Sequence, residues 1–285
     1  MTRAQPRASL YSASLVRFLT ENAMLSPARP TEQVGQKLGD WLDFRQAIAL
    51  HGVLHPEPAY EAHSKPHTKA QPAPAPRQIL IAPEALARHL DQVRDQLVES
   101  ITQGAPAGSG LARIDMPAPV LDEPLDIKTA FEPYRRFVAA HQRQMESTVR
   151  SLRSRLRQQL SQRGSAGQQL AALDAAFENI LAEREAVLLA KTSKLLEKRF
   201  VQALKLHLQD QAKAVQEALA TEAAAAASEG VHRPTSSLSP QPNPNPWLMP
   251  LRQTLRQALS AELDTRLQPA LGLLEAITSD TPQEQ

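Results

Sequence analysis

VRSLRSRLRQQLSQRGSAGQQLAALDAAFENIL, residues 149–181, decides the fold of this 285-residue chain. Apolar residues recur every three or four positions on both sides of residues 164–167, which is the spacing of one face of an α-helix. If the chain reverses near Ser165, facing residues have numbers that sum to about 330. The facing pairs are then Leu160 with Leu170, Leu156 with Leu173, Leu152 with Phe177, and Val149 with Leu181. The sequence therefore predicts an antiparallel helical hairpin.

The hairpin extends well beyond this turn. The same pairing rule brings Phe131 opposite Phe200 and Tyr134 opposite Leu195 or Leu196, so we assign residues 127–228 to the hairpin. The second arm continues through the alanines of residues 223–227. Alanine favours helix strongly but buries little apolar surface. We therefore expect the second arm to overhang the first.

Charged residues lie beside the predicted seam. The facing pairs are Arg150 with Glu183, Arg153 with Glu178, and Arg157 with Asp174. Opposite charges at the flanks of an apolar seam are typical of coiled-coil-like pairing. They support the same register as the apolar residues.

Prolines divide the rest of the chain. Most of the 23 prolines fall within residues 55–83, 104–124 and 229–250. Because proline interrupts helices, these windows are predicted to be linkers. We predict an all-α fold: a long antiparallel helical hairpin with short N-terminal helices and a C-terminal helix, joined by Pro-rich disordered linkers. The predicted segments are a short-helix module (9–54), a Pro/His-rich linker (55–77), an amphipathic helix (78–104), a linker (105–126), the hairpin (127–228), a Pro-rich linker (229–246) and the C-terminal helix (247–278).

The C-terminal helix is predicted from a four-residue repeat. It begins near Trp247, and leucines then recur every four residues from Leu251 to Leu267. Pro269 is expected to kink or stop the helix, although the apolar pattern resumes after it. We expect this helix to cover the overhang of the second arm.

Composition excludes several classes of protein. The chain has no cysteine, which excludes disulfides and thiolate chemistry. No window approaches the roughly 18 apolar residues that cross a bilayer, and the start does not resemble a secretory leader. The sequence lacks a Gly-rich phosphate loop, a nucleophile elbow and an HExxH motif. We therefore expect no enzymatic activity, no cofactor and no membrane insertion, and a cytoplasmic location.

Two pairs of histidines have metal-ligand spacing. His51 and His55 are four residues apart, and His63 and His67 repeat this spacing in a Pro-rich segment. Zinc needs three or four preorganised ligands, and the sequence supplies nothing that completes either set. A solvated histidine-containing linker is the preferred interpretation, and no metal site is assigned.

Arginines follow the first arm of the hairpin. They are Arg135, Arg136, Arg143, Arg150, Arg153, Arg155, Arg157 and Arg163. Such a series could track a nucleic-acid backbone, although few aromatic residues that could stack on bases accompany it. The alternative is that half of these arginines pair with acids on the facing arm.

Two tryptophans are candidate anchors. Trp41 and Trp247 suit either a binding hot spot or docking within the protein, and both readings stay open. The candidate interaction residues of the sequence are Trp41, Arg150, Arg153, Arg157 and Trp247.

Several sequence blocks carry a family resemblance. They are SLVRFL (14–19), LGDWLD (38–43), FEPYRR (131–136), LEKRF (196–200) and AELDTRLQP (261–269). Together they resemble a proteobacterial family catalogued as a domain of unknown function, number three-three-four-eight. That family has no assigned activity, so the resemblance carries over no functional residues. Members are often encoded near proton-channel components and an OmpA-like protein, which implies a cytoplasmic accessory to an envelope motor-type assembly.

The sequence favours a non-enzymatic helical interaction or structural protein. The predicted arms are too long to be buried by the remaining helices, so we expect a protein partner or self-association. The alternative is a nucleic-acid-associated protein that uses the arginine face of the hairpin.

Overall fold

A computed structural model describes residues 13–26, 34–55, 80–119, 126–226 and 245–279. These residues form an all-α structure without strands, which confirms the predicted fold class. The helices in chain order are α1 (Ser14–Glu21), α2 (Val34–Trp41), α3 (Phe44–Leu54), α4 (Pro83–Thr102), α5 (Glu132–Ser161), α6 (Ser165–Ala226) and α7 (Leu248–Ser279). None of them is long and apolar enough to cross a membrane.

The predicted chain reversal lies between α5 and α6. Gly164 has φ +111°, a backbone conformation that residues with a side chain rarely adopt. One turn later, Gly167 packs against α5, and a Cβ at this position would overlap the carbonyl oxygen of Leu160. The two glycines therefore have different roles. Gly164 allows the chain to reverse, and Gly167 allows the first turn of α6 to pack closely against the last turn of α5.

The far end of the hairpin has the predicted pairing. The rings of Phe131 and Phe200 lie 5.3 Å apart between centroids, and the ring of Tyr134 lies 5.5 Å from that of Phe200. All three side chains are buried. Since these contacts are distant from the turn in sequence, they confirm that α6 runs antiparallel to α5. The predicted seam is not closed throughout: Leu170, expected opposite Leu160, is 39% exposed, and Leu188 is 50% exposed.

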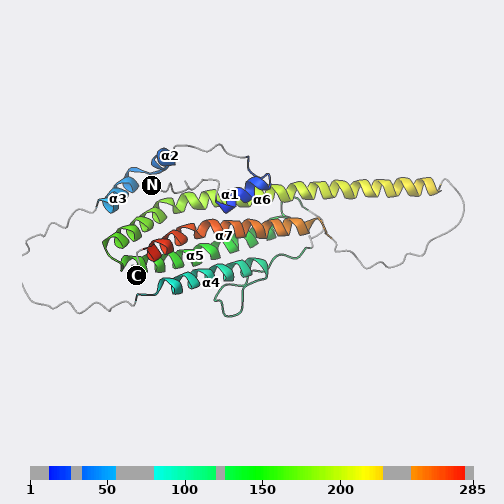
Figure 1. The fold of residues 1–285 in the computed structure, drawn as a ribbon. Helices are drawn as coiled ribbons and strands as arrows, with labels where there is room; N and C mark the ends of the chain where they lie inside the picture. Colours follow the sequence, from blue (N-terminus) through cyan, green and yellow to red (C-terminus); the bar gives the residue numbers. More distant parts are fainter. Residues whose placement is uncertain (1–12, 27–33, 56–79, 120–125, 227–244, 280–285) are drawn as a thin grey trace, which may run out of the picture.

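Two further helices pack on α5 and complete the bundle (Figure 1). α4 runs antiparallel to α5: Ile81, before its first turn, donates its backbone N–H to Gln159 at 2.8 Å, and Ser100 near its end meets Gln144 at 3.3 Å. α7 contacts both α4 and α5. The core consists mainly of leucines on α4, α5 and α7, as the low aromatic content requires.

The described part of the predicted linker 105–126 is ordered. Its described residues, up to 119, have irregular backbone, yet Leu111, Ile114 and Met116 pack against the core. Arg252 of α7 donates a hydrogen bond to the carbonyl of Pro117 at 2.6 Å. These contacts attach the connection to the bundle. The predicted linkers 55–77 and 229–246 lie almost entirely outside the described residues.

α7 spans the segment predicted for the C-terminal helix, 247–278, and continues through Pro269, so of the kink or stop expected at this proline the stop is wrong. A proline inside a helix destabilises it by about 3 kcal/mol. Beyond Pro269, however, Ala270, Leu273 and Ile277 are all buried in the core. Burying one large aliphatic side chain contributes roughly 1.5–3 kcal/mol, so packing on both sides of the proline outweighs the lost hydrogen bond.

α7 also does not cover the overhang of α6. The ring of Trp247, just before α7, lies 5.7 Å from that of Phe200 and 5.2 Å from that of His207. From there α7 runs back toward the hairpin turn, where the carbonyl of Ile277 accepts a hydrogen bond from Arg163 at 3.2 Å. The free end of α6 therefore projects beyond the bundle alone, as Figure 1 shows.

The N-terminal helices dock at separate places. α1 packs on α7, and α3 packs on α6 near the hairpin turn. No side chain next to α1 caps its start, and the N–H of Leu15 instead donates to the hydroxyl of Thr265 on α7 at 3.2 Å. By contrast, α3 has its own capping box, formed by Asp43 and Gln46.

The close approach at Gly167 predicts the effect of a small substitution. Gly167→Ala should lower the free energy of unfolding by about 1–3 kcal/mol, because the methyl group forces α5 and α6 apart. Urea denaturation measures the change. Gly272→Ala is the matched control, since nothing lies within 4 Å of a Cβ at that position of α7. It should stabilise the protein by about 0.5–1 kcal/mol through helix propensity. Equal effects of the two substitutions would show that the arms do not meet at Gly167.

Candidate functional site

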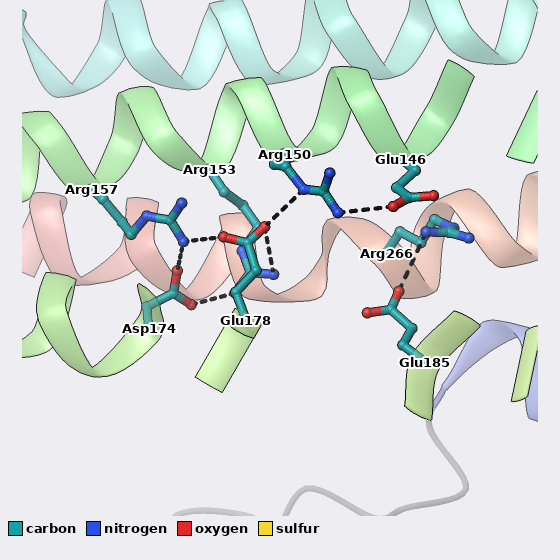
Figure 2. A network of polar contacts seen from close by, with 8 residues as sticks. All are labelled: Glu146, Arg150, Arg153, Arg157, Asp174, Glu178, Glu185 and Arg266. Carbon is teal, nitrogen blue, oxygen red and sulfur yellow. Dashed lines mark hydrogen bonds and ion pairs between the residues drawn. The ribbon is translucent and has the colours of Figure 1, made fainter. Parts of the chain in front are cut away.

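An ion-pair network joins the two arms of the hairpin (Figure 2). Arg153 and Arg157 lie one turn apart on α5, and both contact Asp174 of α6, at 2.7 and 3.0 Å. Arg157 also donates to Glu178 of α6. The four side chains are largely buried, with Arg153 only 12% exposed. Charge-assisted hydrogen bonds strengthen when water is excluded, so this balanced group holds the register of the arms.

Two of the three predicted ion pairs are confirmed. Arg157 pairs with Asp174, and Arg153 lies 3.8 Å from Glu178. The predicted pairing of Arg150 with Glu183 is wrong, because Arg150 contacts Glu146 at 2.8 Å and Glu178 at 3.8 Å. Glu183 lies five residues after Glu178, about 140° further around the helix, and is exposed.

A second ionic group ties α7 to the hairpin. Arg266 pairs with Glu262 at 2.9 Å and with Glu185 of α6 at 3.4 Å, while Gln142 of α5 donates to Glu262 at 2.8 Å. Glu262 is 1% exposed. Burial raises the pKa of Glu262, and the nearby Arg266 opposes this rise. The sequence analysis missed this group, although the four-residue spacing of Glu262 and Arg266 could have revealed it.

A groove of about 410 Å³ lies beside these ion pairs. Its lining is mostly apolar and includes Leu15 of α1, Val149 of α5 and Leu188 of α6. Trp41 of α2 forms part of its wall, and the guanidinium of Arg184 lies 5.6 Å from the centre of the Trp41 ring. We call this cavity the Trp41 groove.

The structure brings some of the predicted interaction residues together. Trp41, Arg150 and Arg153 all line the Trp41 groove, and Arg157 adjoins it through the ion-pair network. Trp247 does not belong to this group. It is half-buried against Phe200 and His207, where it docks the start of α7 onto α6.

The free part of α6 is a second candidate surface. We call residues 209–226 the α6 extension. All of its described side chains are exposed, including Val215 at 60% and Leu219 at 61%. The sequence analysis predicted the overhang but did not select these residues. Their helical spacing, in line with Leu208 and Ala212, was the signal available.

The arginine series is engaged mainly within the protein. Arg135, Arg150, Arg153 and Arg157 contact acids on α6, so the expectation that half of the eight pair with the facing arm is confirmed. Arg136 pairs with Glu132 on its own helix, and Arg163 donates to backbone carbonyls.

The histidines show no metal-like arrangement within the described ranges. The rings of His51 and His55 lie 4.7 Å apart, whereas His63 and His67 fall outside those ranges. Across the helices and loops that the structure describes, no three potential ligands cluster together. His141 of α5 is buried against Phe137, and its Nε2 meets no hydrogen-bond partner among the described residues.

Comparison with known protein families gives a match over nearly the whole chain. A family model described as "Protein of unknown function (DUF3348)" matches residues 1–279. This match covers nearly the whole chain and agrees with the resemblance of the sequence blocks. No curated protein and no solved structure matches the chain.

Because Arg153 and Arg157 are paired and largely buried, substitution of either arginine is expected to lower the stability of the protein. Arg153→Gln should lower the free energy of unfolding by about 1–3 kcal/mol, because Asp174 and Glu178 each lose a charged partner in a partly dry seam. Urea denaturation measures the effect. The control is Arg113→Gln, which removes an exposed pair with Asp115 and should change stability by less than about 0.5 kcal/mol. A matching small change in both variants would contradict a structural role.

Burial of His141 predicts a dependence of stability on pH. Desolvation lowers the pKa of His141 to about 4, whereas the unfolded chain has the ordinary value of 6.5. Between these values the unfolded chain binds the extra proton, so stability falls by about 3 kcal/mol as the pH drops from 6.5 to 4. His141→Leu should remove this slope in urea denaturation measured across that range. An unchanged slope would assign the pH dependence to other groups.

Proposed function

We propose that this chain, which belongs to the DUF3348 family of proteins of unknown function, is a non-enzymatic helical interaction protein. In this proposal the α6 extension is the surface on which another macromolecule docks. The bundle of α4, α5 and α7, together with the first half of α6, holds that surface in place.

The unequal arms of the hairpin carry the proposal. α6 has 62 residues and α5 has 30, so α6 continues long after its partner helix has ended. Val215 and Leu219 expose most of their apolar surface on this continuation. Most of the stability of a helix in a protein comes from tertiary packing, and the described side chains of residues 209–226 are all exposed, so this part of α6 gains little stability of that kind. Docking of a partner would bury these side chains and stabilise the helix.

The chemistry of the described residues supports a structural role. The charged side chains beside the Trp41 groove contact one another across α5, α6 and α7, and the closest contacts are 2.5–3.4 Å. Such pairs position helices relative to one another. This use of the charges supports the non-enzymatic part of the proposal.

The nucleic-acid alternative has less support. It requires Arg150, Arg153 and Arg157 to face a phosphate backbone, yet Arg153 and Arg157 are largely buried beside α6 carboxylates. The α6 extension offers no substitute, because Lys213 is accompanied by Asp210 and Glu217. Phosphate binding favours a continuous basic surface.

The resemblance to the family extends the proposal to a process. Family members are often encoded near proton-channel components and an OmpA-like protein, so we propose a cytoplasmic accessory to an envelope motor-type assembly. The contacts of the described residues support only the interaction role, whereas the process is supported by the family resemblance alone.

The proposal predicts that two side chains of the α6 extension control binding. Tagged wild-type chain and the double variant Val215→Glu/Leu219→Glu are expressed in the native cell, and co-purifying proteins are quantified by mass spectrometry. Proteins bound in stoichiometric amounts by the wild type should be lost from the variant by tenfold or more, because two carboxylates replace the apolar contact.

Leu206→Glu is the matched control. Leu206 is 60% exposed, as Val215 is, but lies on the opposite face of α6. This variant should retain the bound proteins. Identical sets from all three chains, or no stoichiometric partner for the wild type, would refute the α6 extension as a docking surface. Circular dichroism confirms that the variants keep their helix content.

A further inference from the structure

We propose that this chain binds the surface of an anionic lipid bilayer through α3 and the outer side of α6. This proposal goes beyond the proposed function and does not involve the α6 extension. It rests on two observations about one side of the molecule. An apolar patch on α3 is exposed, and a row of lysines on α6 has no acid to neutralise it.

The apolar patch lies on the side of α3 that faces away from α6. α3 packs on α6 and on no other helix that the structure describes, and its Leu50 and Val53 are half-buried. Phe44 and Ile48 lie on the opposite side of α3 and are 80% and 56% exposed. Phe44 is the most exposed large apolar side chain of the described residues. We call Phe44 and Ile48 the α3 patch.

The cations form a row along α6. We call Lys191, Lys194, Lys198 and Lys205 the lysine row. All four are exposed, and none of them pairs with an acid in the part of the chain that the structure describes. From residue 186 to residue 209 the one acid of α6 is Glu197, and Arg135 of α5 occupies it at 2.6 Å. A row of unopposed cations about 21 Å long attracts an anionic partner.

The α3 patch and the lysine row face the same side of the molecule. Lys198 lies two positions after the buried Leu196, about 200° further around the helix. Lys194 has the same relation to the buried Thr192. The row therefore points away from the core. Figure 1 shows α3 on this side of α6, away from α4, α5 and α7.

Arg184 connects the two parts. It lies seven residues before Lys191, on the same face of α6, and its guanidinium is 5.6 Å from the centre of the Trp41 ring at the end of α2. Val187 and Leu188 lie between Arg184 and the lysine row and are 57% and 50% exposed. Cations and exposed apolar side chains therefore occur together along this side.

An anionic bilayer accommodates both parts at once. Amphipathic helices at a membrane surface bury their apolar side roughly 5–10 Å deep, while basic side chains stay among the lipid headgroups. A helix is about 10 Å across, so α3 at this depth places the outer side of α6 at the level of the headgroups. With 11 residues, α3 is too short to cross a bilayer and lies in its plane. A nucleic-acid duplex would attract the lysine row but would leave Phe44 and Ile48 in water.

Flotation with lipid vesicles tests the role of the charges. The full chain should bind vesicles of phosphatidylcholine mixed with phosphatidylglycerol, should not bind vesicles of phosphatidylcholine alone, and should be released by added salt. Lys194→Gln/Lys198→Gln/Lys205→Gln should bind the anionic vesicles about a hundredfold more weakly, because each basic residue near an anionic surface contributes a factor of about five.

Arg88→Gln/Arg113→Gln/Lys128→Gln is the matched control for charge. It removes the same charge from exposed positions of α4, which does not contact α6, and of the segment that follows α4. This variant should bind the anionic vesicles as the wild type does.

Two apolar substitutions test the role of α3. Phe44→Gln/Ile48→Gln should weaken binding to the anionic vesicles by about tenfold or more, because these side chains no longer bury apolar surface in the bilayer. Leu80→Gln/Met249→Gln is the matched control, at positions that are 53% and 49% exposed before α4 and on α7. It should bind as the wild type does.

A wild type that does not bind the anionic vesicles would overturn the proposal, and so would equal losses in the variants and their controls. A loss confined to the lysine variant would overturn the role of α3. Duplex DNA is titrated in parallel: binding of DNA without binding of vesicles would assign the lysine row to nucleic acid instead. Circular dichroism confirms that each variant keeps its helix content.

Discussion

Burial of α5 on three sides is the constraint from which the rest of the structure follows. α4, α6 and α7 all pack against this helix, and each buries a different part of its surface. Seven of its residues from Tyr134 to Leu156 are buried apolar side chains, and His141 is buried among them. Because α5 is only 30 residues long, it also limits how much of any neighbour can be covered. The bundle therefore extends only as far as α5 does.

The hairpin could be predicted from sequence because the apolar and the charged residues of the two arms indicate the same register. One reversal point aligned Phe131 with Phe200 and Arg157 with Asp174, and two unrelated helices would not satisfy both pairings. The position of α7 could not be predicted in this way. Its four-residue repeat shows that one face is buried but does not identify the neighbour, so the expectation that it covers the free end of α6 was wrong and α7 packs mainly on α5. Pro269 was misjudged for the same reason, since the packing that maintains the helix comes from outside it.

Residues of the candidate surfaces could be predicted where they follow from the register of the hairpin, and not where they depend on how other helices pack. Arg153 and Arg157 were identified because charges that oppose each other across a seam follow from its register. The contact between Arg266 and Glu185 joins α7 to α6 and requires knowledge of the tertiary fold. Trp41 and Trp247 looked equivalent in the sequence. In the structure one borders a groove and the other lies against Phe200, because burial of a tryptophan depends on which helix happens to lie opposite.

The start of α1 has a consequence for the order in which the chain acquires structure. Helix α1 has eight residues, and the backbone N–H of Leu15 donates a hydrogen bond to the hydroxyl of Thr265, 250 residues further along. So short a helix is unstable alone. During synthesis the segment that forms α1 leaves the ribosome before the segment that forms α7, yet α1 can fold in place only after α7 has emerged. Of the helices that the structure describes, α1 is made before the others but folds late, and loss of α7 would remove the surface on which it packs.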